Sequence, residues 1–110
     1  MDERTMFVGQ SRLPVAWLVL MQGAGTRASF DLGAITSIGR AGWGNEVVLE
    51  DPHVSGQHAR IRMEGGRHVL YDLGSTNGTW VNGRRVLRMM LMDGDDITLG
   101  TTTLRFKEVR

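Results

Sequence analysis

The chain has 110 residues, of which 41% are hydrophobic, which is enough for one domain with a buried core and excludes wholesale disorder. It contains no cysteine, which excludes a disulfide framework and a thiolate metal site. Thirteen basic residues against twelve acidic ones leave a formal net charge of +1, a balance that favours neither nucleic-acid nor membrane binding.

The N-terminal residues, 1–13, are polar and mixed in charge without a sustained period, so we expect a flexible tail followed by one domain over residues 14–110. Thr5 follows three charged residues in this tail, a setting that an acid-directed Ser/Thr kinase could modify. The sequence shows no secretory signal and no apolar run of the ~20 residues that a membrane-spanning helix needs. We therefore expect a soluble, cytoplasmic protein.

From Val15 onward the chain breaks into short apolar or alternating runs separated by glycine. The predicted strands are 15–21, 27–32, 35–38, 46–49, 58–63, 67–72, 80–81, 85–87, 97–99 and 102–109. No window sustains the spacing of an amphipathic helix; residues 87–92 come nearest, over too short a stretch. Many short strands bounded by turn signals predict an all-β sandwich or barrel.

Two Asn-Gly pairs lie five positions apart, Asn77-Gly78 and Asn82-Gly83. The second pair lies between residues 79–81 and 84–86, the spacing of a two-residue type I′ hairpin turn. The first pair must then belong to a loop that contains Ser75, Thr76 and Asn77. Such a loop offers hydroxyl, amide and backbone N–H groups that could hold an anion or a peptide. The alternative is a turn that satisfies only its own backbone.

Two further motifs carry polar side chains. Arg40 follows directly on the glycine that ends a predicted strand, which would leave its guanidinium free at a sheet edge. Ser55 and His58, with Asp72 as orienter, have the residue types of a nucleophile and its base. No nucleophile elbow or oxyanion hole accompanies them, so we expect no catalysis. The three histidines lack the spacing of metal ligands, and we expect no metal and no other cofactor.

Taken together, these motifs strongly resemble the forkhead-associated (FHA) domain. The resemblance is carried by Gly39-Arg40, Ser55-x-x-His58, the stretch DLGSTNGTxVNG at residues 72–83 and DGDxIxLG at residues 93–100. It runs from about Val15 to Val109. It implies an eleven-stranded β-sandwich whose loops at one end bind a phosphothreonine peptide.

The resemblance also implies a role for each motif residue. Arg40 would pair with the phosphate, Ser55 and Thr76 would donate hydroxyl hydrogen bonds to it, and the Gly56 amide could add one more. Asn77 would bind the main chain of the ligand beside the phosphothreonine. Structural roles fall to four residues: Gly39, His58, Asn82 and Gly83.

One departure from the family pattern concerns Gly56, because the position after the serine is commonly arginine or another basic residue. The absence of that basic residue would lower the affinity for phosphate unless another arginine, such as Arg60 or Arg84, compensates. His53 falls where the family often reads the third residue after the phosphothreonine. Trp43, in a glycine-rich loop, is interpreted as a cap on the sandwich; the alternative is a contact with the ligand.

The sequence leaves three candidate functions. The first is a non-catalytic, monomeric module that binds a phosphothreonine-containing protein, either a Ser/Thr kinase or its substrate. The second is an FHA scaffold that binds its partner through a sheet face, independently of phosphate. The third is an esterase that uses Ser55. The resemblance also raises the hypothesis that a phosphorylated Thr5 folds back into the chain's own site.

Overall fold

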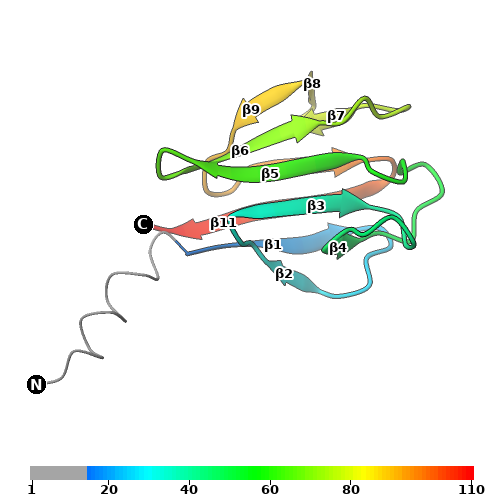
Figure 1. Cartoon of the computed structure of the whole chain (residues 1–110), viewed down its shortest axis with the longest axis horizontal. Coiled ribbons are helices and arrows are strands. Elements are labelled where there is room, and N and C mark those ends of the chain that lie inside the picture. The colour runs from blue at the N-terminus through cyan, green and yellow to red at the C-terminus, as the bar shows by residue number, and fades with distance from the viewer. Residues whose placement is uncertain (1–14) are drawn as a thin grey trace, which may run out of the picture.

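The computed structural model describes residues 15–110, so the predicted tail over residues 1–13, with Thr5, lies outside the described residues. In Figure 1 the described residues form strands and loops, and the long strands lie along one common axis. Eleven strands are formed in the described part of the chain: β1 (Val15–Gln22), β2 (Ser29–Asp31), β3 (Ile35–Gly39), β4 (Val47–Val48), β5 (Ala59–Glu64), β6 (Arg67–Asp72), β7 (Thr79–Val81), β8 (Arg84–Val86), β9 (Arg88–Met90), β10 (Asp96–Leu99) and β11 (Thr102–Val109).

The strands form two sheets. One has six strands in the order β2-β1-β11-β10-β7-β8, and the other has five in the order β4-β3-β5-β6-β9. All neighbours pair antiparallel except β3 and β4, which run parallel. The predicted eleven-stranded sandwich is confirmed. Residues 15–110 contain no helix of the length and apolar character needed to cross a membrane.

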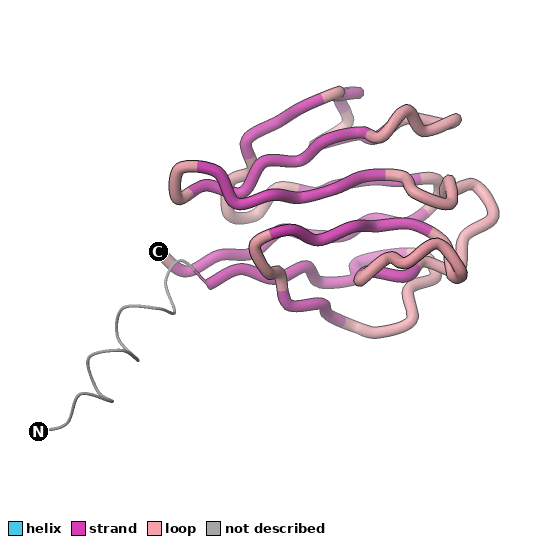
Figure 2. Tube along the Cα trace, viewed as in Figure 1, coloured by secondary structure: helices cyan, strands magenta, loops and turns pink. Residues whose placement is uncertain are grey.

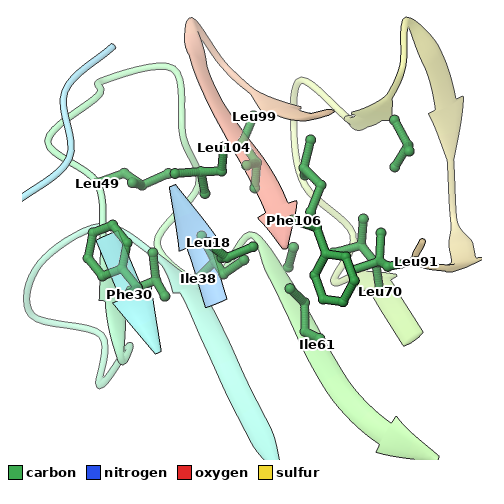
Figure 3. Packing of buried hydrophobic residues seen from close by; sticks show 14 of the residues in the cluster. Leu18, Phe30, Ile38, Leu49, Ile61, Leu70, Leu91, Leu99, Leu104 and Phe106 are labelled. Carbon is green, nitrogen blue, oxygen red and sulfur yellow. The ribbon is translucent and has the colours of Figure 1, made fainter. Parts of the chain in front are cut away.

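The hydrophobic core lies between the sheets and follows from the two-residue period of the strands. Leu18 from β1 and Phe106 from β11 are completely buried, as are Ile38 from β3 and Ile61 from β5. These side chains meet between the layers in Figure 3. Each fully buried aliphatic or aromatic side chain stabilises the fold by about 1.5–3 kcal/mol relative to its exposed state.

Three strand predictions differ clearly from the structure, all at a sheet edge. The predicted strand 27–32 shrinks to the three residues of β2. The predicted strand 46–49 shrinks to the two residues of β4, after which Leu49 leaves the ladder and buries its side chain in the core. The strand β9 was not predicted, because all three of its residues are exposed and show no alternation between the two faces. Edge strands that face solvent carry little of the hydrophobic pattern on which prediction depends.

The connections that matter for function gather at one end of the sandwich. The loops β3–β4, β4–β5 and β6–β7 lie together at the right-hand end in Figures 1 and 2, opposite the end where the C-terminus lies. This arrangement brings the separated sequence motifs side by side.

Candidate functional site

The end of β3 approaches the β4–β5 loop very closely at Gly39. A Cβ atom at Gly39 would lie 2.1 Å from the carbonyl oxygen of Gly56, which only glycine avoids. The same carbonyl accepts the N–H of Arg40 at 3.2 Å. The Arg40 side chain is exposed and forms no ion pair with any residue of 15–110. Its guanidinium is therefore free to bind an anion.

Asn45 is a structural residue of this site that the sequence did not reveal. Its Nδ2 atom donates to the carbonyl oxygen of Arg40 at 2.9 Å and to that of Gly56 at 2.7 Å. A single side chain thus ties the β3–β4 loop to the β4–β5 loop. An asparagine in a glycine-rich loop gives no signal of such a role, because asparagine is common in turns of every kind.

His58 holds the β4–β5 and β6–β7 loops together from beneath. Its side chain is fully buried, and its Nδ1 atom accepts the backbone N–H of Ser55 at 3.0 Å. The proton of the ring therefore sits on Nε2, which donates to the carbonyl oxygen of Gly78 at 2.9 Å. Both ring nitrogens are used to brace backbone.

Ser55 and Asn77 connect the same two loops at the surface. The Oγ atom of Ser55 accepts the N–H of Thr76 at 3.1 Å, which leaves the hydroxyl hydrogen of Ser55 available to a ligand. The Nδ2 atom of Asn77 donates to the carbonyl oxygen of His53 at 2.8 Å. Its Oδ1 atom has no hydrogen-bond donor within residues 15–110, so this oxygen can accept from a ligand N–H.

The β6–β7 loop is shaped from within by Asp72. Its carboxylate accepts the N–H and hydroxyl of Ser75, the N–H of Gly74 and the hydroxyl of Thr79. Burial alone would raise the pKa of the Asp72 carboxyl, but these hydrogen bonds outweigh it and hold the pKa below its ordinary value. The carboxylate stays ionised and fixes the loop that presents Asn77.

The second Asn-Gly pair forms the predicted hairpin turn between β7 and β8. Val81 pairs with Arg84 across the turn, and both Asn82 and Gly83 take positive φ angles, 50° and 83°, as type I′ requires. The first pair has a different place, since Asn77 and Gly78 belong to the β6–β7 loop at the end of the sandwich.

The three loops enclose an open pocket of about 350 Å³. All six residues that the resemblance assigns to ligand binding line it: Arg40, His53, Ser55, Gly56, Thr76 and Asn77. Three other residues complete its lining: Trp43, Pro52 and Val54. Arg60 and Arg84, the expected substitutes for a basic residue at position 56, do not line this pocket. The side chain of Arg85, which pairs with Trp80 across the hairpin, instead lies against Gly78.

Trp43 does not cap the core, so that interpretation is wrong. Its side chain is 55% exposed and forms one wall of the pocket. The indole ring lies directly over Gly56, where an added Cβ atom would come within 2.4 Å of it. The glycine-rich loop extends away from the core, which leaves the tryptophan beside the site and not above the sandwich.

Asp51 is a second residue that sequence reasoning missed. It is only 2% exposed, and one of its oxygens accepts the N–H and hydroxyl of Thr101 and the hydroxyl of Thr102, each within 2.9 Å. The N–H of His53 donates to the other oxygen. Burial would raise the pKa of Asp51, yet these bonds lower it well below its ordinary value. The carboxylate anchors the β4–β5 loop to the β10–β11 turn.

The geometry does not support hydrolysis at Ser55. The Nδ1 atom of His58 is occupied by a backbone N–H and Nε2 by a carbonyl oxygen, so neither can activate the serine hydroxyl. Asp72 bonds to Ser75 and Thr79 and not to His58. Among the residues that the structure describes, no three histidine or acidic side chains gather closely enough to hold a metal ion.

Comparisons with known proteins agree with this geometry. A family model described as the FHA domain matches residues 36–100. The glycogen accumulation regulator GarA of Mycobacterium tuberculosis is 40% identical over 93 residues, which cover 83% of this chain and 56% of GarA. The chain thus spans little more than half the length of this relative.

Two solved structures are also similar. One comes from a structural and functional analysis of phosphothreonine-dependent FHA domain interactions; it has 34% identity, a TM-score of 0.79, and coverage of 87% of this chain and 98% of that chain. The other is Mycobacterium tuberculosis EmbR in complex with a low affinity phosphopeptide, with 31% identity, a TM-score of 0.77, and coverage of 96% and 29%. Because the family model spans more than half of the chain and these neighbours share its fold, the chain belongs to the forkhead-associated (FHA) domain family.

Proposed function

We propose that residues 14–110 form a phosphothreonine-peptide binding module that acts in Ser/Thr kinase signalling without catalysis of its own. The observation that carries the proposal is the pocket in which Arg40, free of any ion pair within residues 15–110, lies beside the hydroxyl donors Ser55 and Thr76 and the neutral amide of Asn77. A single cation among neutral hydrogen-bond donors suits a dianionic phosphate attached to a peptide.

Each group has a distinct task in this proposal. Arg40 supplies charge-assisted hydrogen bonds to the phosphate, and the hydroxyl of Ser55, already oriented by the N–H of Thr76, donates a further one. The Thr76 hydroxyl and the Gly56 amide complete the set of donors. The Oδ1 atom of Asn77 accepts a main-chain N–H of the ligand and thereby fixes the direction of the peptide. His53, at the edge of the pocket, contacts a residue beyond the phosphothreonine.

The relatives support the class of partner. GarA is a regulator by name, and EmbR was solved with a phosphopeptide. For this chain we infer a phosphoprotein partner that is a Ser/Thr kinase or its substrate, met in the cytoplasm by a monomeric domain. Neither nucleic acid nor a membrane is part of the proposal.

The test is a titration with a phosphothreonine peptide library, read by tryptophan fluorescence or NMR. We expect binding of roughly micromolar strength, about −8 kcal/mol, and none with the unphosphorylated peptides. Arg40→Ala should abolish it, whereas Arg62→Ala, the same substitution on a sheet face, should not. Equal binding by wild type and Arg40→Ala would contradict the proposal.

A second candidate function is a scaffold that binds its partner through a sheet face, independently of phosphate. The observation that favours it is a row of side chains across the five-stranded sheet, where Arg60 pairs with Tyr71 and Tyr71 with Arg88. The Arg88 guanidinium lies 5.8 Å from the centre of the Tyr71 ring. Arg88 also pairs with Glu64 at 3.7 Å, and Arg60 and Arg62 beside Tyr71 add two further cations, so the face has an excess of positive charge that fits an acidic partner. Binding that survives Arg40→Ala and is lost with Arg88→Glu would identify this function.

A further inference from the structure

A second pocket continues the candidate site on its far side from Asn77. It has a volume of about 500 Å³ and is lined by Arg40, Ala41, Trp43, Leu49, Glu50, Asp51 and Pro52. It shares Arg40, Trp43 and Pro52 with the first pocket, but neither Thr76 nor Asn77 reaches it. A peptide held at Arg40 and Asn77 would therefore present its residues on the other side of the phosphate to this second pocket.

The wall between the two pockets exists because residue 56 is glycine. The Trp43 indole occupies the space where a side chain at position 56 would begin, since a Cβ atom there would lie 2.4–2.7 Å from three indole atoms. The backbone of the Trp43 loop is held by Gln57, whose Nε2 atom donates to the Trp43 carbonyl oxygen. The space that a side chain at position 56 would need is thus filled by an aromatic ring.

The second pocket also differs from the first in charge. Glu50 is exposed and forms no ion pair with any residue of 15–110. The carboxylate of Asp51 also lines this pocket but is buried, with one oxygen engaged by Thr101 and Thr102 and the other by the N–H of His53. Trp43 and Pro52 supply an apolar wall. An aromatic face beside an unpaired carboxylate suits a long side chain with an apolar stem and a cationic head.

Resting on the proposed function, we propose that this second pocket, the Trp43 subsite, binds an arginine or lysine side chain of the same phosphopeptide. The stem of that side chain packs on the indole of Trp43, and its head pairs with the carboxylate of Glu50. Arg40 does not oppose this, because the bound phosphate carries about −1.5 to −2 charges and more than neutralises it. An acidic residue at the same place would meet Glu50 and the phosphate and be repelled.

The experiment uses a short peptide with phosphothreonine at its centre in a background of alanine and serine. A single arginine is moved through each of the other positions, with matched peptides that carry glutamine or glutamate there. Affinities are measured for the wild-type chain and for Trp43→Ala, Trp43→Phe and Glu50→Gln. Asp31→Asn, a neutralised exposed carboxylate outside both pockets, serves as the control.

At one position, arginine should tighten binding about fivefold over glutamine, the sum of an exposed cation–π contact and an exposed ion pair. Glutamate there should weaken it. Trp43→Ala should remove most of the gain from arginine and Trp43→Phe should keep part of it. Glu50→Gln should reduce the gain, and Asp31→Asn should leave it unchanged. Glu50→Gln and Asp31→Asn, which lie outside the first pocket, should bind the parent phosphopeptide without arginine as the wild type does. Because Trp43 lines both pockets, the gain from arginine in its variants is measured against the same variant's affinity for the glutamine peptide.

Three contrary results are distinguishable. Equal binding of the arginine, glutamine and glutamate peptides at every position would overturn the Trp43 subsite and leave the phosphothreonine module standing. A preference for arginine that persists in both Trp43→Ala and Glu50→Gln would also overturn it. Failure of every phosphothreonine peptide to bind the wild-type chain would overturn the module and the subsite together, because no peptide would then be held beside the second pocket.

Discussion

The Nε2 atom of His58 donates to the carbonyl oxygen of Gly78 across 2.9 Å, joining the residue just before β5 to a loop twenty residues further along the chain. The opposite nitrogen of the same ring accepts the N–H of Ser55. One fully buried side chain therefore sets the spacing between the loop that carries Ser55 and the loop that carries Thr76 and Asn77.

Replacing His58 by alanine should be costly. The variant loses both hydrogen bonds, leaves the partly buried N–H of Ser55 and the buried carbonyl of Gly78 without their partner, and opens a cavity. We expect the free energy of unfolding to fall by about 3 kcal/mol, measured by urea denaturation. His53→Ala, an exposed histidine two residues before Ser55, is the control and should change stability by less than about 0.5 kcal/mol. Equal stability of the two variants would contradict the bracing role.

The contact between β3 and the β4–β5 loop gives a second prediction. In Gly39→Ala the new methyl group would overlap the Gly56 carbonyl oxygen and the Asn45 amide, so the loop must move. We expect a loss of about 2 kcal/mol in unfolding free energy, with NMR shifts spreading to Ser55 and Gly56. Gly33→Ala is the matched control, because no atom lies within 4 Å of the added methyl group. A harmless Gly39→Ala would show that the loop is not held there.

Much of this architecture could be predicted from sequence, because the strands that build the core show an alternation of apolar and polar residues. Alternation places Leu104 and Phe106 on one face of β11, and both are fully buried. The hairpin at Asn82-Gly83 could be predicted for a different reason: a two-residue I′ turn needs positive φ at both positions, which few residue types adopt.

The parts that could not be predicted depend on contacts between distant loops. Nothing local marks Asp51 as the anchor of the β10–β11 turn, since its partners Thr101 and Thr102 lie fifty residues away. The placement of Trp43 was mistaken because an aromatic residue is usually buried, and only the structure reveals that Gly56 makes room for it at the surface. Buried polar networks and loop packing have no sequence period to reveal them.

Asp51 also makes stability depend on pH. Its folded pKa lies below the ordinary value of 3.8, so the stabilisation is complete above that value and is lost as the pH falls through the folded pKa. We expect the unfolding free energy of the wild type to decline below about pH 4. Asp51→Asn should cost about 2–4 kcal/mol at pH 7 and flatten this decline, measured by urea denaturation from pH 7 to pH 3.

The control for that titration is Asp31→Asn, which alters an exposed carboxylate on β2. Its stability should follow the wild-type curve over the whole range. A pH profile of Asp51→Asn that ran parallel to the wild type would show that other carboxylates carry the acid sensitivity. Asp72 and Asp96, whose pKa values are also lowered, would then be the next residues to neutralise.

The two Asn-Gly pairs should separate binding from stability. Asn77→Ala removes an exposed hydrogen bond to His53 and the oxygen proposed to grip the ligand main chain. We expect it to weaken phosphothreonine-peptide binding at least about tenfold, or 1.4 kcal/mol, while the unfolding free energy changes by about 0.5 kcal/mol.

Asn82→Ala should have the opposite effect, lowering stability and leaving binding intact. Alanine tolerates the positive φ of 50° at this position less well than asparagine does. The substitution also removes the hydrogen bonds that the Asn82 side chain forms with the Asp95 carboxylate and the Asp96 N–H. A loss of about 1–2 kcal/mol in stability should result, with peptide affinity retained, because this turn lies outside the pocket. Fluorescence titration and urea denaturation of both variants decide the matter: if the two asparagines lost affinity and stability in the same proportion, the loop at Asn77 would be a structural turn like the other and not a grip on the ligand.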